Sequence, residues 1–589
     1  MCGIAGLMTK DGSAPNEAAL DDLQQALAHR GPDGAGRYGY GDVRMMQTRL
    51  AIIDLQTGDQ PFLVQSPDEP PIALVANGEI YNYRELYGDL DGVTFQTASD
   101  CELPLHLYRR HGVDYAHTLR GMYAIAIHDA VTDRLVLSRD PFGIKPLYYI
   151  ETDHLFAFAS EPQALIRAGI IEATENAASL HQLFQMQFTS GRETAFAGIQ
   201  RVMPGETLVV RAGRVIERHR ADALAAAGPT EIGEEEALGR LDGLLENSVD
   251  LHQRADVPYG MFLSGGVDSS VLIAMMQRLN AAPVQAFTAG FDGTGVPDER
   301  AHAQDVARAT GAEHTEVNFG EADFWDLLPR IAAAMDDPAA DYAVLPTYKL
   351  AAAARQAGLK VVLSGEGGDE MFAGYGRYRR AARSRLFGGR PLRAAGQLQG
   401  MGLLRRDDAA WRACFEETAK ALPRSFSGLQ KAQATDCADW LPNDLLSKLD
   451  RCLMAHGVEG RVPFIDPVLA DFAFRLPDKL KVRGRLGKWL LRKWLQSALP
   501  VSQPMSKKRG FTVPVGEWIS AKGKDLGALV AAQPGIERYC HGDAVRALFQ
   551  LSGKREGQAQ WNLLFFALWH GHYFQGKPTD GDVFDVLAA

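Results

Sequence analysis

The segment 261–270, MFLSGGVDSS, joins a short apolar run to a glycine-rich turn and then to the start of a predicted helix. We expect a strand at 261–263, a turn at Gly265 and Gly266, and a helix from Ser269. Glycines let backbone N–H groups approach an anion closely, and the N-terminus of a helix carries about half a positive charge. The segment therefore favours a phosphate-binding turn, although a simple strand-to-helix connection would read the same in isolation.

The same alternation continues downstream of this turn. Strands are predicted at 284–291, 314–319 and 360–363, and a helix at 298–310 separates the first two. Strands that alternate with helices predict a parallel, doubly wound sheet. From about residue 378 onward the pattern is mostly helical, so helices are added to this sheet.

The beginning of the chain has a different pattern. Short apolar runs at 72–75, 122–127, 135–137 and 155–158 are separated by turn residues, and 129–133 reads as a hairpin loop. Strands joined by short hairpins predict antiparallel sheets.

The two patterns meet near residues 221–233, which are rich in alanine and glycine and contain Pro229. A chain of 589 residues is too long for one hydrophobic core, and such a segment is typical of a domain boundary. We expect an N-terminal domain at 1–215 and a C-terminal domain at 235–589.

Composition excludes several classes of function. The net charge of -11 disfavours binding to a nucleic-acid backbone, and the basic stretch 377–393 is interpreted as a solvated helix face. No apolar run approaches the roughly 20 residues of a membrane helix, and only Met1 precedes Cys2, so a cytoplasmic protein is expected. The six cysteines lie far apart and show no C-x-x-C spacing for zinc or for a disulfide framework.

Cys2 is a candidate nucleophile. If Met1 is removed, the thiol and a free α-amine belong to one residue, and an amine with a pKa of about 7.7–8.0 can take the proton of the thiol. A cysteine at position two would by itself be interpreted as an incidental residue of a frayed terminus.

Four strings downstream support the catalytic interpretation: HRGPDG at 29–34, RLAII at 49–53, NGEIYN at 77–82, and Ser99-Asp100. With Cys2 they resemble the glutaminase domain of the amidotransferases that have an N-terminal nucleophile. The resemblance implies an oxyanion hole formed by the Asn77 side chain and the Gly78 N–H. It implies Arg49 for the α-carboxylate of glutamine and Glu79 with Asp100 for its ammonium group. The pocket would be lined by Leu50, Ala51, Ile52 and Ile53.

A second glycine-rich string, SGEGGDEMF at 364–372, follows another predicted parallel strand. Ligands bind beyond the carboxyl ends of such strands, so this string and 264–270 are expected at the same edge. Its three acids, Glu366, Asp369 and Glu370, would repel one another, and Mg²⁺ is the simplest explanation for their proximity. The chain has no G-x-x-x-x-G-K-[ST] string, so γ-phosphate transfer of the kinase type is not implied.

The segment 264–270 resembles the pyrophosphate-binding loop of enzymes that cleave ATP between its α and β phosphates. Together, the two sets of motifs resemble the asparagine synthetase family. The implied fold is an α-β-β-α antiparallel sandwich of the N-terminal nucleophile hydrolase type, followed by a doubly wound parallel α/β ATP-pyrophosphatase domain with added helices. Strings at 451–459, 461–466 and 507–511 also resemble the family, and we assign them no catalytic role.

The resemblance assigns residues in the second domain. Asp268 and Asp369 would bind Mg²⁺ on the pyrophosphate, and Glu366 would be the base that deprotonates ammonia. Lys488 would reach the β and γ phosphates, with Arg485, Arg492 and Lys493 as alternatives. The remaining contacts to ATP are expected from Leu263, Ser264, Gly265, Gly266, Ser269, Ala289, Ser364 and Gly365.

The implied function is a carbon–nitrogen ligase that converts ATP, aspartate and glutamine to asparagine, glutamate, AMP and pyrophosphate through β-aspartyl-AMP. One alternative is the same chemistry on another carboxylate, such as a cell-wall or polysaccharide precursor. Others are a relative that only hydrolyses glutamine and one that only senses nucleotide. A homodimer is one oligomeric state that the resemblance allows.

Overall fold

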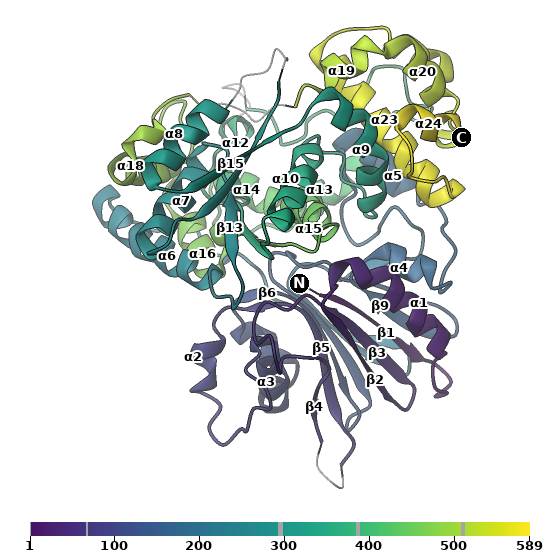
Figure 1. The fold of residues 1–589 in the computed structure, drawn as a ribbon, viewed down its shortest axis with the longest axis vertical. Coiled ribbons are helices and arrows are strands. Elements are labelled where there is room, and N and C mark those ends of the chain that lie inside the picture. Colours follow the sequence, from purple (N-terminus) through teal and green to yellow (C-terminus); the bar gives the residue numbers. More distant parts are fainter. Residues whose placement is uncertain (1, 66–68, 293–298, 384–388, 508–512) are drawn as a thin grey trace.

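The computed structural model describes residues 2–589 except 66–68, 293–298, 384–388 and 508–512. It contains antiparallel sheets below and a parallel sheet with many helices above, in the view of Figure 1. The chain passes from one to the other between β12 (Arg214–Arg220) and α6 (Glu234–His252). The segment 221–233, where a domain boundary is predicted, is this connection.

Two six-stranded antiparallel sheets pack face to face in the N-terminal region. The first has the order β10 (Gln200–Arg201), β8 (Tyr148–Glu151), β9 (Leu155–Ala159), β1 (Gly3–Thr9), β3 (Val43–Arg49), β2 (Gly34–Tyr40). The second has the order β12, β11 (Glu206–Arg211), β7 (Arg134–Arg139), β6 (Gly121–Asp129), β5 (Ile72–Ile80), β4 (Phe62–Val64).

Strand β1 contributes side chains to two hydrophobic cores, one on each face of its sheet. Ile4 and Met8 lie in the core between the sheets, whereas Ala5 and Leu7 belong to the core that includes buried residues of α1 (Glu17–Leu27). Successive residues of a strand point to opposite faces, which explains the division. On the far side of the second sheet, α3 (Leu103–His111) packs on β5 and β4, so the layers are α-β-β-α as expected.

The C-terminal sheet is parallel and has the order β15 (Glu313–Asn318), β14 (Gln285–Gly290), β13 (Tyr259–Phe262), β16 (Val361–Leu363), β17 (Glu459–Arg461). Strand order reverses at β13, because β14 and β16 lie on its two sides. Ligands bind outside the carboxyl ends of strands at such a switch point. α7 (Val267–Leu279) begins there, directly after the glycine-rich turn.

Helices cover both faces of the parallel sheet, which confirms the doubly wound prediction. The helices around it are α6, α7, α8 (Arg300–Thr310), α9 (Glu321–Ala334), α10 (Val344–Gln356), α15 (Leu446–Met454), α16 (Pro467–Arg475) and α18 (Trp489–Ala498). A further helical group contains α19 (Val515–Ala521), α20 (Gly523–Ala531), α21 (Pro534–Tyr539), α22 (Gly542–Leu548), α23 (Lys554–Gln575) and α24 (Val583–Ala588).

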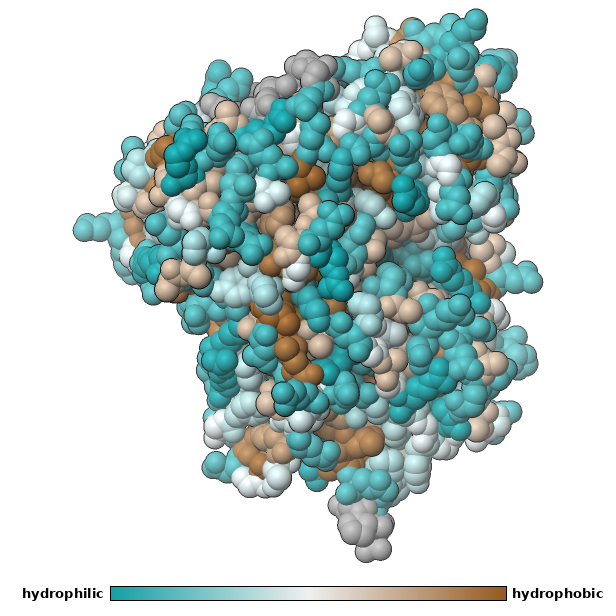
Figure 2. Space-filling view, in the orientation of Figure 1, coloured by the Kyte–Doolittle hydropathy of each residue, from teal (hydrophilic) through white to brown (hydrophobic). Residues whose placement is uncertain are grey.

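The two regions share apolar contacts. α5 (Ala177–Met186), from the N-terminal part, packs Phe184 against Phe566 of α23 with ring centroids 4.5 Å apart. The largest buried cluster therefore contains residues of both regions. On the face in Figure 2 hydrophilic residues predominate, and apolar residues form small separate patches. In the described residues, no helix is both long and apolar enough to span a membrane.

The predicted elements agree with the observed ones to within a few residues. The strands at 284–291, 314–319 and 360–363 correspond to β14, β15 and β16, and residues 130–133 of the predicted loop 129–133 separate β6 from β7. α7 begins at Val267, two residues before the predicted start. The helix predicted from 298 is seen from Arg300, and residue 298 lies outside the described part. β17 was missed because three residues carry too little pattern.

The interpretation of 377–393 as a solvated helix face is wrong for two of its arginines. Arg377 donates to Asp436 at 2.6 and 2.9 Å and lies over the ring of Tyr375. Arg393 is mostly buried, 3.7 Å from Asp436, and lies over Trp440. Planar guanidinium groups stack on aromatic rings while keeping an ion pair, so arginine charge can be buried here.

Candidate active sites

Cys2 lies directly before β1 and is 8% exposed. Its backbone nitrogen donates to Oδ1 of Asn77 at 3.0 Å. Asn77 is fully buried in β5, and its Nδ2 has no hydrogen-bond partner among the described residues. An unsatisfied buried donor beside a thiol is suited to bind an oxyanion.

Gly78 follows Asn77 in β5, opposite Tyr123 of β6. A Cβ at Gly78 would lie 2.3 Å from the carbonyl oxygen of Met122, so any side chain there would displace the neighbouring strand. The glycine therefore permits the close approach of β5 and β6 next to Asn77.

Burial raises the pKa of the Cys2 thiol, and the carboxylates of Glu459 and Glu79 act in the same direction. The backbone N–H of Leu50 opposes them by donating to the sulfur. Because the thiolate is disfavoured at rest, the reaction needs a base next to Cys2.

Glu79 and Asp100 lie together beside β5. Oδ2 of Asp100 accepts from the Ile80 N–H at 2.6 Å, and Oε2 of Glu79 lies 3.2 Å from Arg461. Burial raises the pKa of Asp100 to about 6, against the effect of the Ile80 N–H. Burial also raises the pKa of Glu79, with Glu459 and Asp100 adding to the effect and Arg461 opposing it.

Arg49 ends β3, and its guanidinium is engaged within the N-terminal region. Nη1 donates to Asp59 at 2.6 Å, and Nη2 donates to the carbonyl of Asp54. Asp59 is mostly exposed, so a substrate carboxylate could take its place at little cost. After Arg49, Leu50 and Ile52 are buried and Ala51 and Ile53 half-buried.

The second site is a cavity of about 610 Å³ at the carboxyl ends of β13 and β16. Every residue predicted for ATP lines it: Leu263, Ser264, Gly265, Gly266, Asp268, Ser269, Ala289, Ser364, Gly365 and Lys488. Glu366 and Asp369 line it as well. Turns more than 90 residues apart therefore share one edge, as the parallel order requires.

Lys488 lies between the two predicted metal ligands. It precedes α18 with φ of +56°, and its Nζ contacts Asp268 and lies 2.7 Å from Oδ1 of Asp369. A Cβ at Gly368 would lie 2.5 Å from Oδ1 of Asp268, so the two turns approach too closely for a larger residue. Arg492, one of the alternatives, instead donates to the carbonyls of Gly487 and Ser506.

The three acids of 364–372 have different surroundings, so their proximity does not by itself require a cation, and Mg²⁺ on Asp268 and Asp369 stays a prediction. Glu366 lies 3.2 Å from Lys448, Asp369 pairs with Lys488, and Glu370 is buried. Burial, with Asp369 and Glu366, raises the pKa of Glu370 to about 8. In the described residues no cluster of three or more metal-binding side chains is present.

Sequence reasoning missed Lys448 of α15. It is buried, and its Nζ lies 3.1 Å from Asp341 and 3.2 Å from Glu366. Burial lowers the pKa of Lys448, but Asp341, Glu366 and Asp444 outweigh this effect and raise it overall. No motif surrounds Lys448, and its place on a buried helix face was the only signal.

Two arginines link the sites across the junction. Nε of Arg30 donates to the Cys2 carbonyl at 3.2 Å, while its Nη atoms donate to Asp450 at 2.8 and 3.1 Å. Arg461 ends β17, and its carbonyl accepts from the Ser364 N–H at 2.8 Å while its side chain reaches Glu79. Both arginines occur in quoted strings, but the partners that link the two sites, Asp450 for Arg30 and Glu79 for Arg461, lie far away in the sequence.

Comparison with known proteins agrees with this two-site arrangement. The glutamine amidotransferase domain model matches residues 1–220, and the asparagine synthase model matches residues 240–571. The chain belongs to the asparagine synthase family, as the motifs indicate.

Three relatives show the extent of the similarity. Asparagine synthetase [glutamine-hydrolyzing] 1 of Bacillus subtilis is 32% identical, with 97% of this chain and 96% of the relative aligned. A putative asparagine synthetase of Mycobacterium tuberculosis is 33% identical over 98% of both. Asparagine synthetase B of Escherichia coli is 29% identical over 88% of this chain and 83% of its own.

Proposed function

We propose that this chain is a glutamine-hydrolysing asparagine synthetase, which forms asparagine from aspartate, glutamine and ATP. One observation carries the proposal: this family member retains both domains, each with its own group of reactive residues. In the first, Cys2 lies beside the unsatisfied Asn77 amide. In the second, Lys488 lies beside Asp268 and Asp369. We place the glutaminase domain at 1–215 and the synthetase domain at 235–589.

In the first reaction, the Cys2 sulfur attacks the carboxamide carbon of glutamine. The α-amine of Cys2, freed when Met1 is removed, takes the thiol proton, and Asn77 Oδ1 orients this nitrogen. Asn77 Nδ2 and the Gly78 N–H stabilise the oxyanion. Ammonia leaves, and water hydrolyses the thioester to glutamate.

In the second reaction, the side-chain carboxylate of aspartate attacks the α-phosphate of ATP, and pyrophosphate leaves. Lys488 holds the leaving phosphates, while the turns at 264–269 and 364–365 hold the nucleotide. Ammonia then attacks the acyl carbon, Glu366 accepts its proton, and AMP leaves.

The residues present fit Mg²⁺. Mg²⁺ commonly takes one or two protein carboxylates and completes its shell with water and substrate phosphates, so Asp268 and Asp369 suffice. When bound, the ion would neutralise negative charge on the phosphates. Lys488 already brings both carboxylates to one point of the cavity.

The test is a product assay with glutamine, ATP and a panel of carboxylates. Asparagine, AMP and pyrophosphate in equal amounts from aspartate are the expected result. Amidation of another carboxylate but not of aspartate would assign a different acceptor. Glutamate formation without any amide product would leave only a glutaminase.

A further inference from the structure

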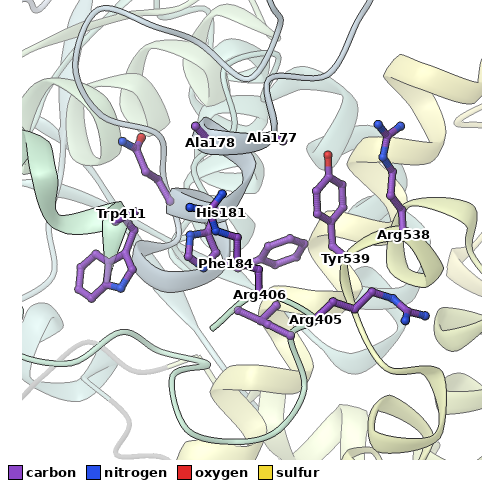
Figure 3. A pocket seen from close by; sticks show the side chains of 12 residues that line it. Ala177, Ala178, His181, Phe184, Arg405, Arg406, Trp411, Arg538 and Tyr539 are labelled. Carbon is purple, nitrogen blue, oxygen red and sulfur yellow. The ribbon is translucent and has the colours of Figure 1, made fainter. Parts of the chain in front are cut away.

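The first part of the chain, 1–220, and the second part, 240–571, which match the two family models, meet at more than one place. Figure 3 shows one of them, a cavity of about 230 Å³ lined by α5 and by the segment of Tyr539. Among the described residues that line this cavity, none is predicted for catalysis. Another place of contact lies beside Cys2, where side chains of the second part reach the glutamine site.

Side chains hold both ends of the Cys2 residue. The strand pairing of β1 begins at Gly3, one residue later. The Cys2 nitrogen donates to Oδ1 of Asn77 at 3.0 Å, and the Cys2 carbonyl accepts from Nε of Arg30 at 3.2 Å. The position of the thiol therefore depends on Asn77 and on Arg30, and not on the sheet alone.

Asp450 determines the orientation of Arg30. Arg30 is fully buried, and its Nη1 and Nη2 donate to the two oxygens of Asp450 at 2.8 and 3.1 Å. A carboxylate that binds a guanidinium in this bidentate way fixes the plane of the group, and with it the direction of Nε. Nη1 also donates to Glu161 at 2.7 Å. Asp450 belongs to α15, so a residue of the second part controls a contact of the nucleophile.

Arg461 of β17 also crosses the junction. Its Nη2 lies 3.2 Å from Oε2 of Glu79, one of the two acids predicted to bind the ammonium group of glutamine. Nε donates to Glu459 at 2.6 Å, and Nη1 donates to the carbonyls of His252 and Arg254 at 3.0 and 2.7 Å. These three partners lie in the second part and fix the guanidinium so that Nη2 faces Glu79.

We propose that the second part of the chain completes the glutamine site. Asp450, through Arg30, positions Cys2 for attack, and Arg461 positions Glu79 for the ammonium group of glutamine. The inference rests on the proposed function, because it assigns roles within the glutaminase reaction. The two roles differ in their kinetic effect. Misplacing the nucleophile lowers kcat, whereas misplacing a group that binds the substrate raises KM.

Asp450→Asn tests the first role in the full-length protein. Asparagine has the size of aspartate, but its Nδ2 cannot accept a hydrogen bond, so Arg30 loses its bidentate partner. The kcat of glutamine hydrolysis should fall at least about tenfold, while the KM for glutamine stays within about twofold. Arg30→Lys retains the charge but lacks the guanidinium fork, and should show the same loss of kcat. This second variant serves if Asp450→Asn does not fold.

Arg461→Met tests the second role. The KM for glutamine should rise at least about tenfold at pH 7, and kcat should change less. Burial raises the pKa of Glu79 and Arg461 opposes this effect, so without this cation the Glu79 carboxyl is protonated over a wider range of pH. The ratio of the KM of Arg461→Met to that of the unmodified protein should therefore decrease from pH 7 to about pH 8.5.

The other titratable groups near Glu79 are present in both proteins, so this ratio isolates the effect of Arg461. They are Glu459, Asp100, Tyr81, Cys101, Cys2 and the amino terminus. Arg461→Lys, which retains a cation, should recover part of the affinity for glutamine.

Asp337→Asn is the matched control. Asp337 lies in the second part and accepts from Arg201 of the first part at 2.5 and 2.8 Å, and both side chains are buried. This ion pair crosses the same junction, but among the described residues it contacts neither Cys2 nor Glu79. Its loss should leave kcat and KM for glutamine unchanged. Ammonium-dependent synthesis should stay within about twofold in every variant that circular dichroism shows to be folded.

Three results would overturn the inference. The first is an unchanged kcat in Asp450→Asn and Arg30→Lys, and the second is an unchanged KM in Arg461→Met. The third is an equal loss in Asp337→Asn, which would show a general effect of breaking a buried ion pair. An unmodified protein that does not hydrolyse glutamine would refute the proposed function and the inference with it, and this result differs from the other three.

Discussion

Charge is arranged differently at the two sites. In the nucleotide cavity four acids lie beside a lysine: Asp268 and Asp369 contact Lys488, and Asp341 and Glu366 lie 3.1 and 3.2 Å from Lys448. The positive groups lie where phosphates would bind. Substrates must therefore replace ion pairs that already exist.

Around Cys2 the acids Glu79, Asp100 and Glu459 are buried, and Arg461 lowers the pKa of all three, with Lys145 adding to its effect on Glu459. Burial nevertheless raises the pKa of Glu79 and Asp100 overall. A positive group brought by the substrate would favour the ionised form of these two carboxyls. The ammonium group of glutamine would supply it, whereas the nucleotide cavity is arranged for an anion.

The largest effect should come from Cys2→Ala, which separates the two sites. Glutamine-dependent synthesis should fall on the order of 10⁴-fold or more, because no other nucleophile replaces the thiol. Synthesis from added ammonium should remain. The matched control is Cys101→Ala, whose thiol is also buried and lies 3.4 Å from the Gly78 carbonyl. Loss of both activities in a folded Cys2→Ala protein would contradict the two-site assignment.

Glu366→Gln should have the opposite selectivity. Amide synthesis should drop by about 10²–10⁴-fold with either nitrogen source, since the base is lost, while glutamine hydrolysis continues. Exchange of labelled pyrophosphate into ATP, which reports adenylation alone, should survive in Glu366→Gln and fail in Asp369→Asn.

Glu370→Gln provides the matched control. Since burial raises the pKa of Glu370 to about 8, its carboxyl is mostly protonated at neutral pH, and glutamine is a close substitute. If Glu366→Gln were fully active and Glu370→Gln inactive, Glu370 would be the base.

Much of this arrangement was predictable from the sequence because it depends on local patterns. The strand–turn–helix order places 264–270 and 364–372 at one edge without any knowledge of side chains. The string 77–82 places Asn77 and Gly78 in one strand. The positions of such residues follow from the course of the backbone alone.

The ion pairs could not be predicted in this way. Arg30 and Asp450 are 420 residues apart, and Arg377 and Asp436 are 59 apart. Nothing local distinguishes an arginine that will be buried against an acid from one that remains in solvent. The same applies to Lys448, and to the lysines that separate the three acids of 364–372.

Asn77 variants test the oxyanion hole with a smaller expected effect. Asn77→Asp keeps an oxygen that can accept from the Cys2 nitrogen but removes the Nδ2 donor. Glutaminase turnover should fall about 10²–10³-fold, as is typical for one such donor. Ammonium-dependent synthesis should not change, and full glutaminase activity in Asn77→Asp would exclude the donor role.

The smallest effect concerns pH at the glutamine site. Burial raises the pKa of Asp100 to about 6, so its carboxyl is ionised at pH 7 and becomes protonated as the pH falls through 6. A protonated Asp100 attracts the glutamine ammonium less, so the KM for glutamine should rise about tenfold at pH 5. The effect of the same proton on stability has the opposite sign. The folded state binds it more tightly than the unfolded state does, so the free energy of unfolding increases as the pH falls from 6 towards 4. Asp100→Asn should have a high KM for glutamine that does not change with pH. Ammonium-dependent synthesis, which does not use the glutamine site, is the internal control for other groups that titrate in this range. A KM for glutamine that stays constant between pH 7 and 5 in the unmodified protein would show that Asp100 does not hold the ammonium group.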